Sequence, residues 1–434
     1  MNIILLSGGS GKRLWPISND VRSKQFIKIF KTGAYQYESM VQRVYRQISS
    51  VNPDTKVTIA TSLEQVSAIR NQLNNDVSIC VEPCRRDTFP AIVLAATYLH
   101  DVLHVAEDEA VAVCPVDPYV EDNFYEAVAG LEKFVQAGAA NLTLMGIEPN
   151  VPSDKYGYII PQEHAAVSAV SEFKEKPDVE TAKSYIAKGA LWNAGIFAFK
   201  LGYLLDIAHK MVDFSDYKDL FSKYEALTKI SFDYAVVEKE PSIQVVRYNG
   251  EWKDVGTWNM ISEVMSENTK GNVTCDEACE NTHVINELGI PVLCMGCKDM
   301  VIAASSDGIF VSEKKRSSGI KSYVEKISTD IRYAEKSWGT YNVMDAQSGA
   351  VTIKVSLYAG KHMSYHRHDF RDEVWTVISG EGLVTVDDME QVVKAGDVVT
   401  IAAGCKHTIK AVTDMQLIEV QIGDVISVED KTVF

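Results

Sequence analysis

Apolar segments of strand length alternate with amphipathic segments of helical length through about residue 265. The apolar segments include KVTIA at 56–60, VSICVEP at 77–83, AVAVCPVD at 110–117 and NLTLMGI at 141–147. Between them, the stretches 37–48 and 126–138 place apolar residues at helical spacing. This alternation predicts an α/β domain with a mostly parallel, Rossmann-like sheet and helices on both faces. In such sheets, ligands bind at the carboxyl ends of the strands.

A glycine-rich turn, LSGGSGKRLW at 5–14, follows the first apolar run of the chain. That run, at 3–6, has the character of a buried parallel strand. Gly8, Gly9 and Gly11 would let the turn bring backbone N–H groups close to an anion. The residues therefore predict a phosphate-binding turn at a strand end.

The two commonest glycine-rich phosphate motifs do not fit this turn. A nucleoside triphosphatase loop needs Gly at position 6 and Ser or Thr at position 13, where Leu6 and Arg13 stand. A dinucleotide fingerprint needs Gly where Leu14 stands. Taken alone, the turn is also compatible with a plain strand-to-helix connection that carries incidental basic residues.

Length and charge limit the class of protein and its partners. A chain of 434 residues suits two or three domains, and 46% apolar with 24% charged residues are ordinary globular values. A net charge of −16 argues against a nucleic-acid or anionic-membrane surface, which needs clustered Lys and Arg. We expect neither partner. The opening residues lack a signal-peptide pattern and no segment approaches about 18 apolar residues, so a cytoplasmic protein is expected.

Eight cysteines without secretory features predict reduced thiols rather than a disulfide framework. Cys275, Cys279, Cys294 and Cys297 form a CxxxC and a CxxC pair whose spacing is compatible with structural zinc. The apolar residues beside them fit buried strand thiols as well, so both interpretations stand.

The alternating pattern ends after the first domain. Residues from about 270 to 330 show short strands with turns and one helical stretch, and the remainder consists of short alternating strands with Gly and Asp turns. We predict an α/β domain at 1–265, a small connector with short strands and a helix at 266–334, and a β-barrel domain at 335–434.

Polar residues at predicted strand ends suggest a phosphoryl-transfer site in the first domain. Asp117 and Asp254 would offer two carboxylates to Mg²⁺, which takes oxygen ligands and tends to share them with phosphate. Asn193 stands in another such stretch. Four cations are available to neutralise the charge that builds up during phosphoryl transfer: Lys12, Arg13, Lys24 and Lys176.

LSGGSGKRLWPIS, followed by RSKQF, resembles the signature of the sugar-1-phosphate nucleotidyltransferases. It is similar in particular to the mannose-1-phosphate guanylyltransferase family, whose long bacterial members carry a C-terminal type II phosphomannose isomerase domain. The resemblance continues in order at EPCRRDTFPAI (82–92), PVDPYV (115–120), YGYI (156–159), FKEKP (173–177), WNAGIFAF (192–199), SFDYAVVEK (231–239) and WKDVGTW (252–258). It covers nearly the whole chain.

The resemblance implies roles for residues of this chain. Those implied to bind the nucleotide are Leu6, Gly8, Gly9, Gly11, Lys12, Arg13, Glu82, Arg86 and Asp87. Those implied to bind the sugar phosphate are Gly157, Glu175, Lys176, Asn193 and Gly195. The implied catalytic residues are Arg13, Lys24 on the leaving pyrophosphate, Lys176, and Asp117 with Asp254 on Mg²⁺.

The implied reaction is in-line attack of a sugar 1-phosphate oxygen on the α-phosphorus of an NTP, with release of pyrophosphate. The products would be an NDP-sugar and pyrophosphate, with GDP-mannose formed from GTP and mannose 1-phosphate. No protein nucleophile is needed, because the attacking phosphate is already ionised. The protein would contribute alignment and cancellation of repulsion between two anions.

Two departures from the family pattern mean that the sequence is compatible with more than one nucleotide and more than one phosphorylated acceptor. Arg85, Arg86 and Asp87 stand where the family usually has Gly-Arg-Asn, and Pro118 replaces the His that usually follows Asp117. The same chemistry with CTP or UTP, or with another phosphorylated acceptor, is the first alternative. A non-catalytic regulator that binds nucleotide sugars is the second.

The C-terminal domain resembles a cupin. His366 and His368 alternate so that they share one face of a strand. With Glu373 and His407 they match the paired motifs of cupins, which implies a divalent transition metal such as Zn, Mn, Fe, Ni or Co.

The isomerase domain that this barrel resembles usually reads Gln-x-His-x-His-Arg-x-Glu-His-Trp. Aligned without gaps, His366 stands at Gln, Phe370 at the second His and Val374 at the last His. Three positions fit: Arg371, Glu373 and Trp375. We therefore predict a metal-binding cupin with a different or lost activity, and keep isomerisation of mannose 6-phosphate as the alternative. The sequence does not fix the oligomeric state, and a homodimer is compatible with it.

Overall fold

The computed structural model describes residues 1–9, 11–33, 36–74, 76–327, 331–427 and 429–434. The chain divides into two compact units. The first comprises Met1–Gly9, Lys28–Val66 and Gln72–Gly256, and the second comprises Ser10–Ile27, Ser67–Asn71 and Thr257–Phe434. The predicted phosphate-binding turn is therefore divided, and Ser10 within it lies outside the described residues. The predicted boundaries at 265 and 334 stay predictions.

A nine-stranded sheet in the order β5-β4-β1-β6-β11-β8-β12-β10-β9 forms the first unit. Its strands are β1 (Asn2–Ser7), β4 (Lys56–Ser62), β5 (Ser78–Glu82), β6 (Ala110–Pro115), β8 (Leu142–Ile147), β9 (Tyr158–Pro161), β10 (Val167–Lys174), β11 (Leu191–Lys200) and β12 (Ile243–Tyr248). The four strands β5, β4, β1 and β6 are parallel, as predicted. β11 runs antiparallel to β6, β8 and β9, and beyond it β8 and β12 form a second parallel pair. The α/β class is confirmed, with a mixed sheet.

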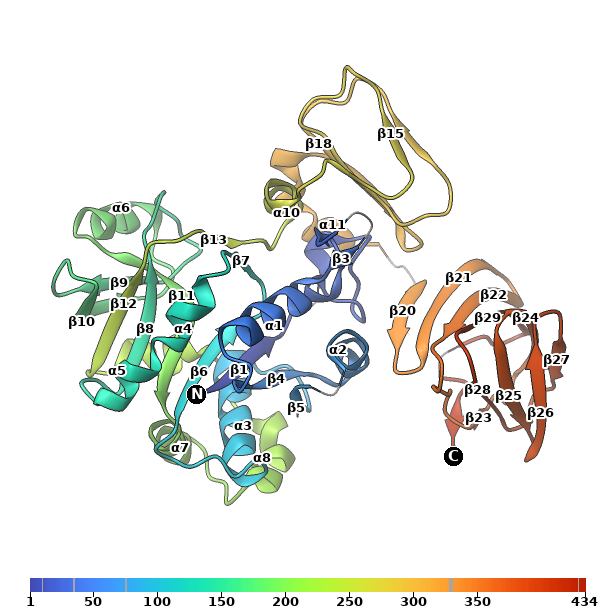
Figure 1. Ribbon diagram of the computed structural model, residues 1–434, viewed down its shortest axis with the longest axis horizontal. Helices are drawn as coiled ribbons and strands as arrows, with labels where there is room; N and C mark the ends of the chain where they lie inside the picture. The colour runs from blue at the N-terminus through green and yellow to red at the C-terminus, as the bar shows by residue number, and fades with distance from the viewer. Residues whose placement is uncertain (10, 34–35, 75, 328–330, 428) are drawn as a thin grey trace. The chain divides into compact units, whose positions relative to one another are not determined.

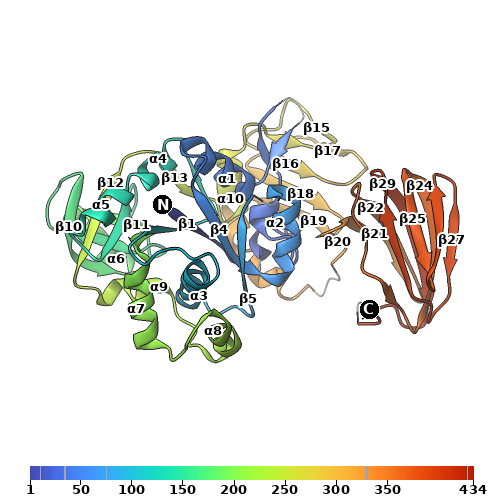
Figure 2. The same cartoon turned by 60° about the horizontal axis from the view of Figure 1, so that its bottom comes forward.

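Helices cover both faces of this sheet (Figure 1). In Figure 2, α3 (Thr88–Asp101), α7 (Leu201–Met211) and α8 (Tyr217–Lys223) lie on one face, and α1 (Met40–Val51) and α4 (Phe124–Ala129) on the other. Most of α3 is buried because its sequence is apolar on nearly every side. The shorter helices are α2 (Val66–Leu73), α5 (Glu132–Ala137), α6 (Val179–Ala187) and α9 (Phe232–Ala235).

The carboxyl ends of the parallel strands lie at one edge of the sheet, as parallel pairing requires. β1 ends just before Gly8, and β6 ends two residues before Asp117. Beside this edge, β7 (Pro118–Val120) pairs antiparallel with β13 (Trp252–Asp254), and this register sets Asp254 opposite Pro118. Two carboxylates from distant parts of the chain therefore lie near each other. A separate hairpin joins β2 (Phe30–Lys31) to β3 (Tyr37–Glu38).

The second unit contains a connector built from short parallel strands. β14 (Thr269–Lys270), β16 (His283–Asn286) and β18 (Met300–Ser305) are parallel neighbours, and β19 (Gly308–Glu313) closes the sheet as a hairpin with β18. β15 (Val273–Cys275) and β17 (Val292–Cys294) form a second parallel pair. The helices here are α10 (Trp258–Val264) and α11 (Lys321–Val324).

Two facing sheets form the C-terminal barrel, in agreement with the predicted cupin. The six-stranded sheet contains β20 (Tyr333–Lys336), β21 (Gly339–Gln347), β22 (Ala350–Leu357), β24 (Arg371–Ser379), β27 (Val398–Ile401) and β29 (Met415–Gly423). The five-stranded sheet contains β23 (His366–Arg367), β25 (Glu381–Val386), β26 (Met389–Lys394), β28 (His407–Ala411) and β30 (Thr432–Val433). Between them lies an apolar core around Trp375, Val384, Ile409 and Leu417.

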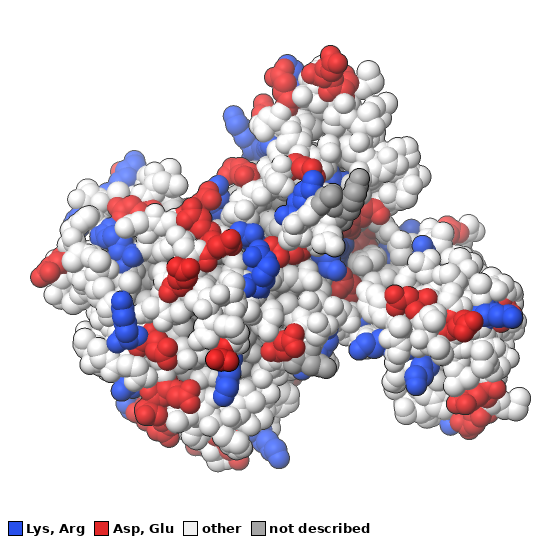
Figure 3. Space-filling model, viewed as in Figure 1, with Lys and Arg blue, Asp and Glu red and all other residues white. Residues whose placement is uncertain are grey.

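Charged side chains of both signs are interspersed over the face of the molecule that Figure 3 shows. Within the described ranges, the structure contains no helix that is both long and apolar enough to cross a membrane.

Candidate functional site

A pocket of about 320 Å³ opens at the carboxyl edge of the parallel strands in the first unit. Leu6 at the end of β1 and Pro115 at the end of β6 form part of its wall. Of the residues predicted from the sequence, those that line it are Leu6, Asp117, Gly157, Glu175, Lys176, Asn193, Gly195 and Asp254. The expected magnesium ligands and the expected sugar-phosphate residues thus surround one space.

A bulge in β11 presents Asn193 and Gly195 to this pocket. The pairing of β11 with β8 is irregular between Asn193 and Phe197, and Gly195 has a φ of 72°, which favours glycine. The Asn193 backbone N–H donates to the Gly157 carbonyl at 2.8 Å, and its side-chain oxygen accepts from the Gly195 N–H at 3.1 Å. These bonds fix the Asn193 amide before any ligand binds.

Glu175 and Lys176 form a charged pair in the pocket lining. Glu175 is buried, and a Cβ at Gly157 would lie 2.5 Å from its Oε2, so only glycine leaves room for this carboxylate. Lys176 Nζ lies 2.5 Å from Glu175 Oε1. Although partial burial opposes the charge, Glu175 and then Asp233 raise the pKa of Lys176 above its ordinary value. Lys176 is therefore a firmly charged ammonium group.

Asp233 lines the same pocket and was not singled out from the sequence, although it lies in the quoted stretch SFDYAVVEK. It stands in the first turn of α9, and its Oδ1 accepts from Asn193 Nδ2 at 2.7 Å. Burial, together with the nearby charge of Glu175, raises the pKa of Asp233 to about 7. Its acidic type and its place in a motif were the available signals.

The residues expected near the base and ribose do not line this pocket. Glu82 accepts a hydrogen bond from the Tyr224 hydroxyl at 2.7 Å, and burial raises the pKa of Glu82. Arg86 donates to the Glu225 carbonyl. Asp87 caps α3 by accepting from the Thr88 N–H at 2.8 Å. All three side chains thus make contacts within the first unit, and their roles in nucleotide binding stay predictions.

The remaining residues of the predicted nucleotide site are divided between the units. Gly8 and Gly9 end the first segment of the first unit, whereas Gly11, Lys12, Arg13 and Lys24 belong to the second. Gly11 has a φ of 65° and precedes a 3₁₀ helix, Lys12–Leu14. A second 3₁₀ helix, Lys24–Phe26, begins at Lys24.

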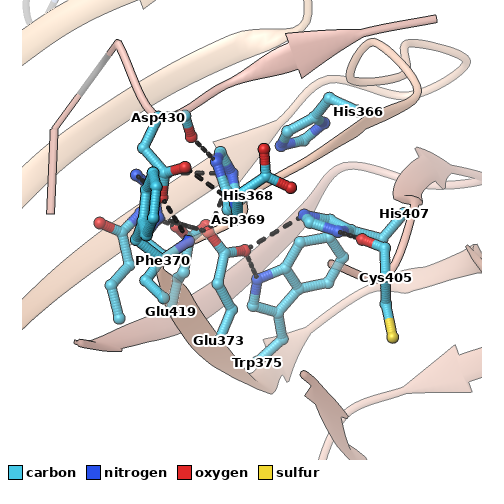
Figure 4. Close-up of polar contacts among 12 residues, drawn as sticks. His366, His368, Asp369, Phe370, Glu373, Trp375, Cys405, His407, Glu419 and Asp430 are labelled. Carbon is cyan, nitrogen blue, oxygen red and sulfur yellow. Dashed lines mark hydrogen bonds and ion pairs between the residues drawn. The ribbon is translucent and has the colours of Figure 1, made fainter. Parts of the chain in front are cut away.

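Three histidines converge inside the C-terminal barrel (Figure 4). His366 on β23 is paired with His407 on the neighbouring strand β28, and His368 lies beside them. All three side chains are buried, and one ring nitrogen of each lies within 4.8 Å of the other two. This spacing allows the three imidazoles to share one metal ion.

Backbone contacts orient the three imidazoles for metal binding. In each ring Nδ1 lies beside a carbonyl: that of Ser364 at 2.7 Å for His366, that of Cys405 at 3.0 Å for His407, and that of Asp430 for His368. A carbonyl accepts only from N–H, so Nδ1 carries a proton in each ring, which leaves Nε2 as the possible metal ligand. Burial, with Lys431 nearby, lowers the pKa of His366 to about 3, which keeps this ring neutral. The donor set fits a divalent transition metal.

Glu373 lies next to the three histidines. Its two oxygens lie 3.2 Å from His368 Nε2 and 3.4 Å from His407 Nε2, and Trp375 Nε1 donates to Oε2 at 3.1 Å. Although burial opposes ionisation, His407, His368 and Arg371 lower the pKa of Glu373 to about 2. Arg371 also donates to Glu373 Oε1 at 3.2 Å and lies 2.9 Å from His368 Nε2. A metal on His368 would therefore replace this arginine contact.

Three positions depart from the isomerase pattern: His366 belongs to the histidine cluster, whereas Phe370 and Val374 lie outside it. Phe370 is 63% exposed. Val374 alternates with the buried Glu373 and Trp375 along β24, so its side chain points to the other face of the strand. Neither side chain is part of the group of three histidines whose ring nitrogens lie close together.

The four connector cysteines lie around one small apolar cluster. Cys275 and Cys294 are directly paired on β15 and β17, and Cys279 Sγ lies 3.5 Å from the Cys294 carbonyl. Within the described residues, however, the histidines form the group whose ligand atoms lie close enough to share an ion. The structure favours the interpretation as thiols packed in a core.

The fold and the pocket together define a class of enzyme. An α/β sheet with a glycine-rich turn after its first strand, and paired carboxylates beside a charged lysine, is the architecture of a nucleotidyltransferase. The family profile described as nucleotidyl transferase matches residues 2–271, and that described as mannose-6-phosphate isomerase C-terminal matches residues 325–434. The class is therefore established by sequence and structure alike.

Comparison with similar proteins identifies the family within this class. A mannose-1-phosphate guanylyltransferase from Escherichia coli (strain K12) is 30% identical over 98% of this chain and 96% of its own length. Mannose-1-phosphate guanylyltransferase ManC from Salmonella typhimurium is 29% identical over 98% of this chain and 96% of its own. A solved structure described as mannose-1-phosphate geranyltransferase, from Thermus thermophilus, shares 25% identity and a TM-score of 0.62 over 75% of this chain and 98% of its own. The chain belongs to the mannose-1-phosphate guanylyltransferase family.

The raised pKa of Asp233 makes stability depend on pH. Because the folded protein holds this proton up to about pH 7 while the unfolded chain releases it near 3.8, the unfolding temperature of the wild type should fall relative to Asp233→Asn across that interval. Thermal unfolding of both proteins between pH 4 and pH 8 measures the difference. Asp206→Asn, at an exposed position on α7, is the control. If the unfolding temperature of the wild type stays constant or rises relative to that of Asp233→Asn as the pH increases, the raised pKa of Asp233 is contradicted.

The histidine cluster predicts a bound metal. We expect elemental analysis of dialysed wild-type protein to find a stoichiometric divalent transition metal, and His366→Ala to lower metal affinity at least about tenfold through loss of one ligand. His362→Ala is the matched control, since His362 belongs to the same barrel and not to the cluster. Equal metal content in wild type and His366→Ala would refute the site.

Proposed function

We propose that this chain transfers a guanylyl group from GTP to mannose 1-phosphate, forming GDP-mannose and pyrophosphate. The observation that carries the proposal is the single pocket that holds Asp117, Asp254, Lys176 and Asn193 at the strand edge. The names of the similar proteins supply the substrates, because pocket shape alone does not distinguish one nucleotide or one sugar from another.

The charge of the pocket supports a cation-assisted reaction. Its lining contains the carboxyl groups Asp117, Glu175, Asp233 and Asp254 but only two ammonium groups, Lys155 and Lys176. Such a lining repels two phosphorylated substrates unless positive charge is added. Asp117 and Asp254 are hard oxygen donors of the type Mg²⁺ prefers, and we propose that they hold it. When bound, Mg²⁺ would supply charge neutralisation at the phosphates.

In this proposal, side chains of the protein align the two substrates and recognise the sugar 1-phosphate. Lys176 is placed to pair with the phosphate of the sugar 1-phosphate, and Asn193, fixed by its hydrogen bonds to Gly157, Gly195 and Asp233, offers its amide to a sugar hydroxyl. An oxygen of that phosphate attacks the α-phosphorus of GTP, and the bond from this phosphorus to the pyrophosphate oxygen breaks. Arg13 and Lys24 are proposed to stabilise the triphosphate and the departing pyrophosphate.

Pyrophosphate release tests this proposal. With GTP, mannose 1-phosphate and Mg²⁺ we expect turnover, and with Asp254→Ala a loss in kcat of about 100-fold or more, the scale on which electrostatic stabilisation of a transition state acts. The assay is run with all four NTPs and a panel of sugar 1-phosphates.

Asp206→Ala on the exposed surface of α7 should leave this activity unchanged. No release with any substrate pair would defeat the transferase proposal, and a preference for CTP or UTP would defeat the guanylyl assignment.

Isomerisation of mannose 6-phosphate is a second candidate, supported by the isomerase C-terminal profile over 325–434 and by the histidine cluster. We expect any conversion to fructose 6-phosphate, followed in a coupled assay, to disappear in His366→Ala and to persist in Asp254→Ala. Activity that survives His366→Ala, or its absence from metal-loaded wild type, would remove this candidate.

A further inference from the structure

The segment that carries the proposed phosphate-binding cations packs within the second unit. Leu14, Ile17 and Phe26 are buried there, so the segment 11–27 is an ordered part of this unit. Lys12 and Arg13 lie near its beginning and Lys24 near its end. What fixes the middle of this segment therefore bears on the cations at both ends.

Hydrogen bonds from α10 and the connector hold the middle of the segment. Trp258 Nε1 donates to the Trp15 carbonyl at 3.1 Å, and Ser305 Oγ donates to the Pro16 carbonyl at 2.6 Å. Gly308 lies against the Trp15 ring so closely that a Cβ at this position would be 2.5 Å from the indole. Residues at the turn between β18 and β19 therefore contact the chain at Trp15 and Pro16.

Asn19 and Asp307 add a buried polar contact. Asn19 Nδ2 donates to Asp307 Oδ2 at 2.7 Å and to the Tyr333 carbonyl at 3.0 Å. Its Oδ1 accepts from the backbone N–H groups of Val21 and Arg22, at 2.9 and 2.7 Å. One side chain therefore shapes the turn before Arg22 and ties it to the connector.

Arg22 and Glu287 form the strongest of these contacts. Arg22 Nη1 and Nη2 donate to the two Glu287 oxygens at 2.6 and 3.1 Å, a bidentate geometry that fixes both distance and orientation. The two side chains are only 9% and 23% exposed. The guanidinium also lies 5.0 Å from the Tyr333 ring centroid, and Lys270 lies 3.6 Å from Glu287. Arg22 stands two residues before Lys24.

We propose that Glu287 and Asp307 are positioning residues for the nucleotide, which act by holding the segment between Lys12 and Lys24 against the connector. The inference rests on the proposed transferase function and assigns the connector a part in it. Because these residues act through Arg22 and Asn19, their loss should loosen contacts with the nucleotide phosphates and leave the sugar-phosphate residues of the first unit unaffected.

Glu287→Gln is the direct test, since it keeps the side-chain shape and removes the charge. We expect the KM for GTP to rise about tenfold or more, the scale of a small misplacement of a binding group, while the KM for mannose 1-phosphate changes less than about twofold. Glu287→Asp, which keeps the charge, should recover part of the loss. Hydrogen–deuterium exchange of peptides spanning 11–27 should accelerate in Glu287→Gln.

Glu280→Gln is the matched control, because Glu280 pairs with Lys298 in the same connector at 2.7 Å rather than with a residue of the segment 11–27. Asp307→Asn provides an independent route to the same segment if Glu287→Gln fails to fold. Equal loss for both substrates together with a lower unfolding temperature would reduce the pair to a structural role and overturn the proposal.

Unchanged exchange over 11–27 in both variants would also overturn it. If the wild type releases no pyrophosphate, the transferase function fails on its own, and the exchange measurement still decides whether the connector holds the segment.

Discussion

Parallel pairing of β1, β4, β5 and β6 is the constraint on which the rest of the first unit depends. It brings every carboxyl end of these strands to one edge, where the chain leaves the core and polar side chains can be exposed without cost. β11 then enters antiparallel beside β6, and its bulge turns Asn193 toward the same edge. The pocket forms where these two strand directions meet, and residues outside the strands, including Asp117 and Tyr156, complete its lining.

Features governed by local sequence were predictable. The buried first strand, the glycine-rich turn and the position of Asp117 follow from apolar runs and from what must happen where a strand ends. The barrel histidines follow from the period of two, which sets His366 and His368 on one face. The α/β class could be derived from such patterns, whereas the cupin and the family were predicted from the resemblance of their motifs to known ones.

Features governed by long-range pairing were not predictable in the same way. Asp254 lies near Asp117 because of the register between two three-residue strands, β7 and β13. No hydrophobic periodicity in the sequence predicts this pairing. Asp233 becomes a proton-holding carboxyl because the fold buries it and places Glu175 close to it in space. The division of the glycine-rich turn between two units depends on contacts with residues near 287 and 307, more than 250 positions away in the chain.

Because residue 22 is an arginine, its contact with Glu287 in the connector fixes an orientation as well as a distance. A lysine could neutralise Glu287, but a single ammonium group would leave the direction of the contact free, whereas the planar guanidinium fixes it at two points. Removing Glu287 would leave the largely buried Arg22 guanidinium without its carboxylate partner, so the pair holds the segment in one register. A small connector with few buried apolar residues cannot give such definition by packing alone, and here charge and hydrogen bonding provide it.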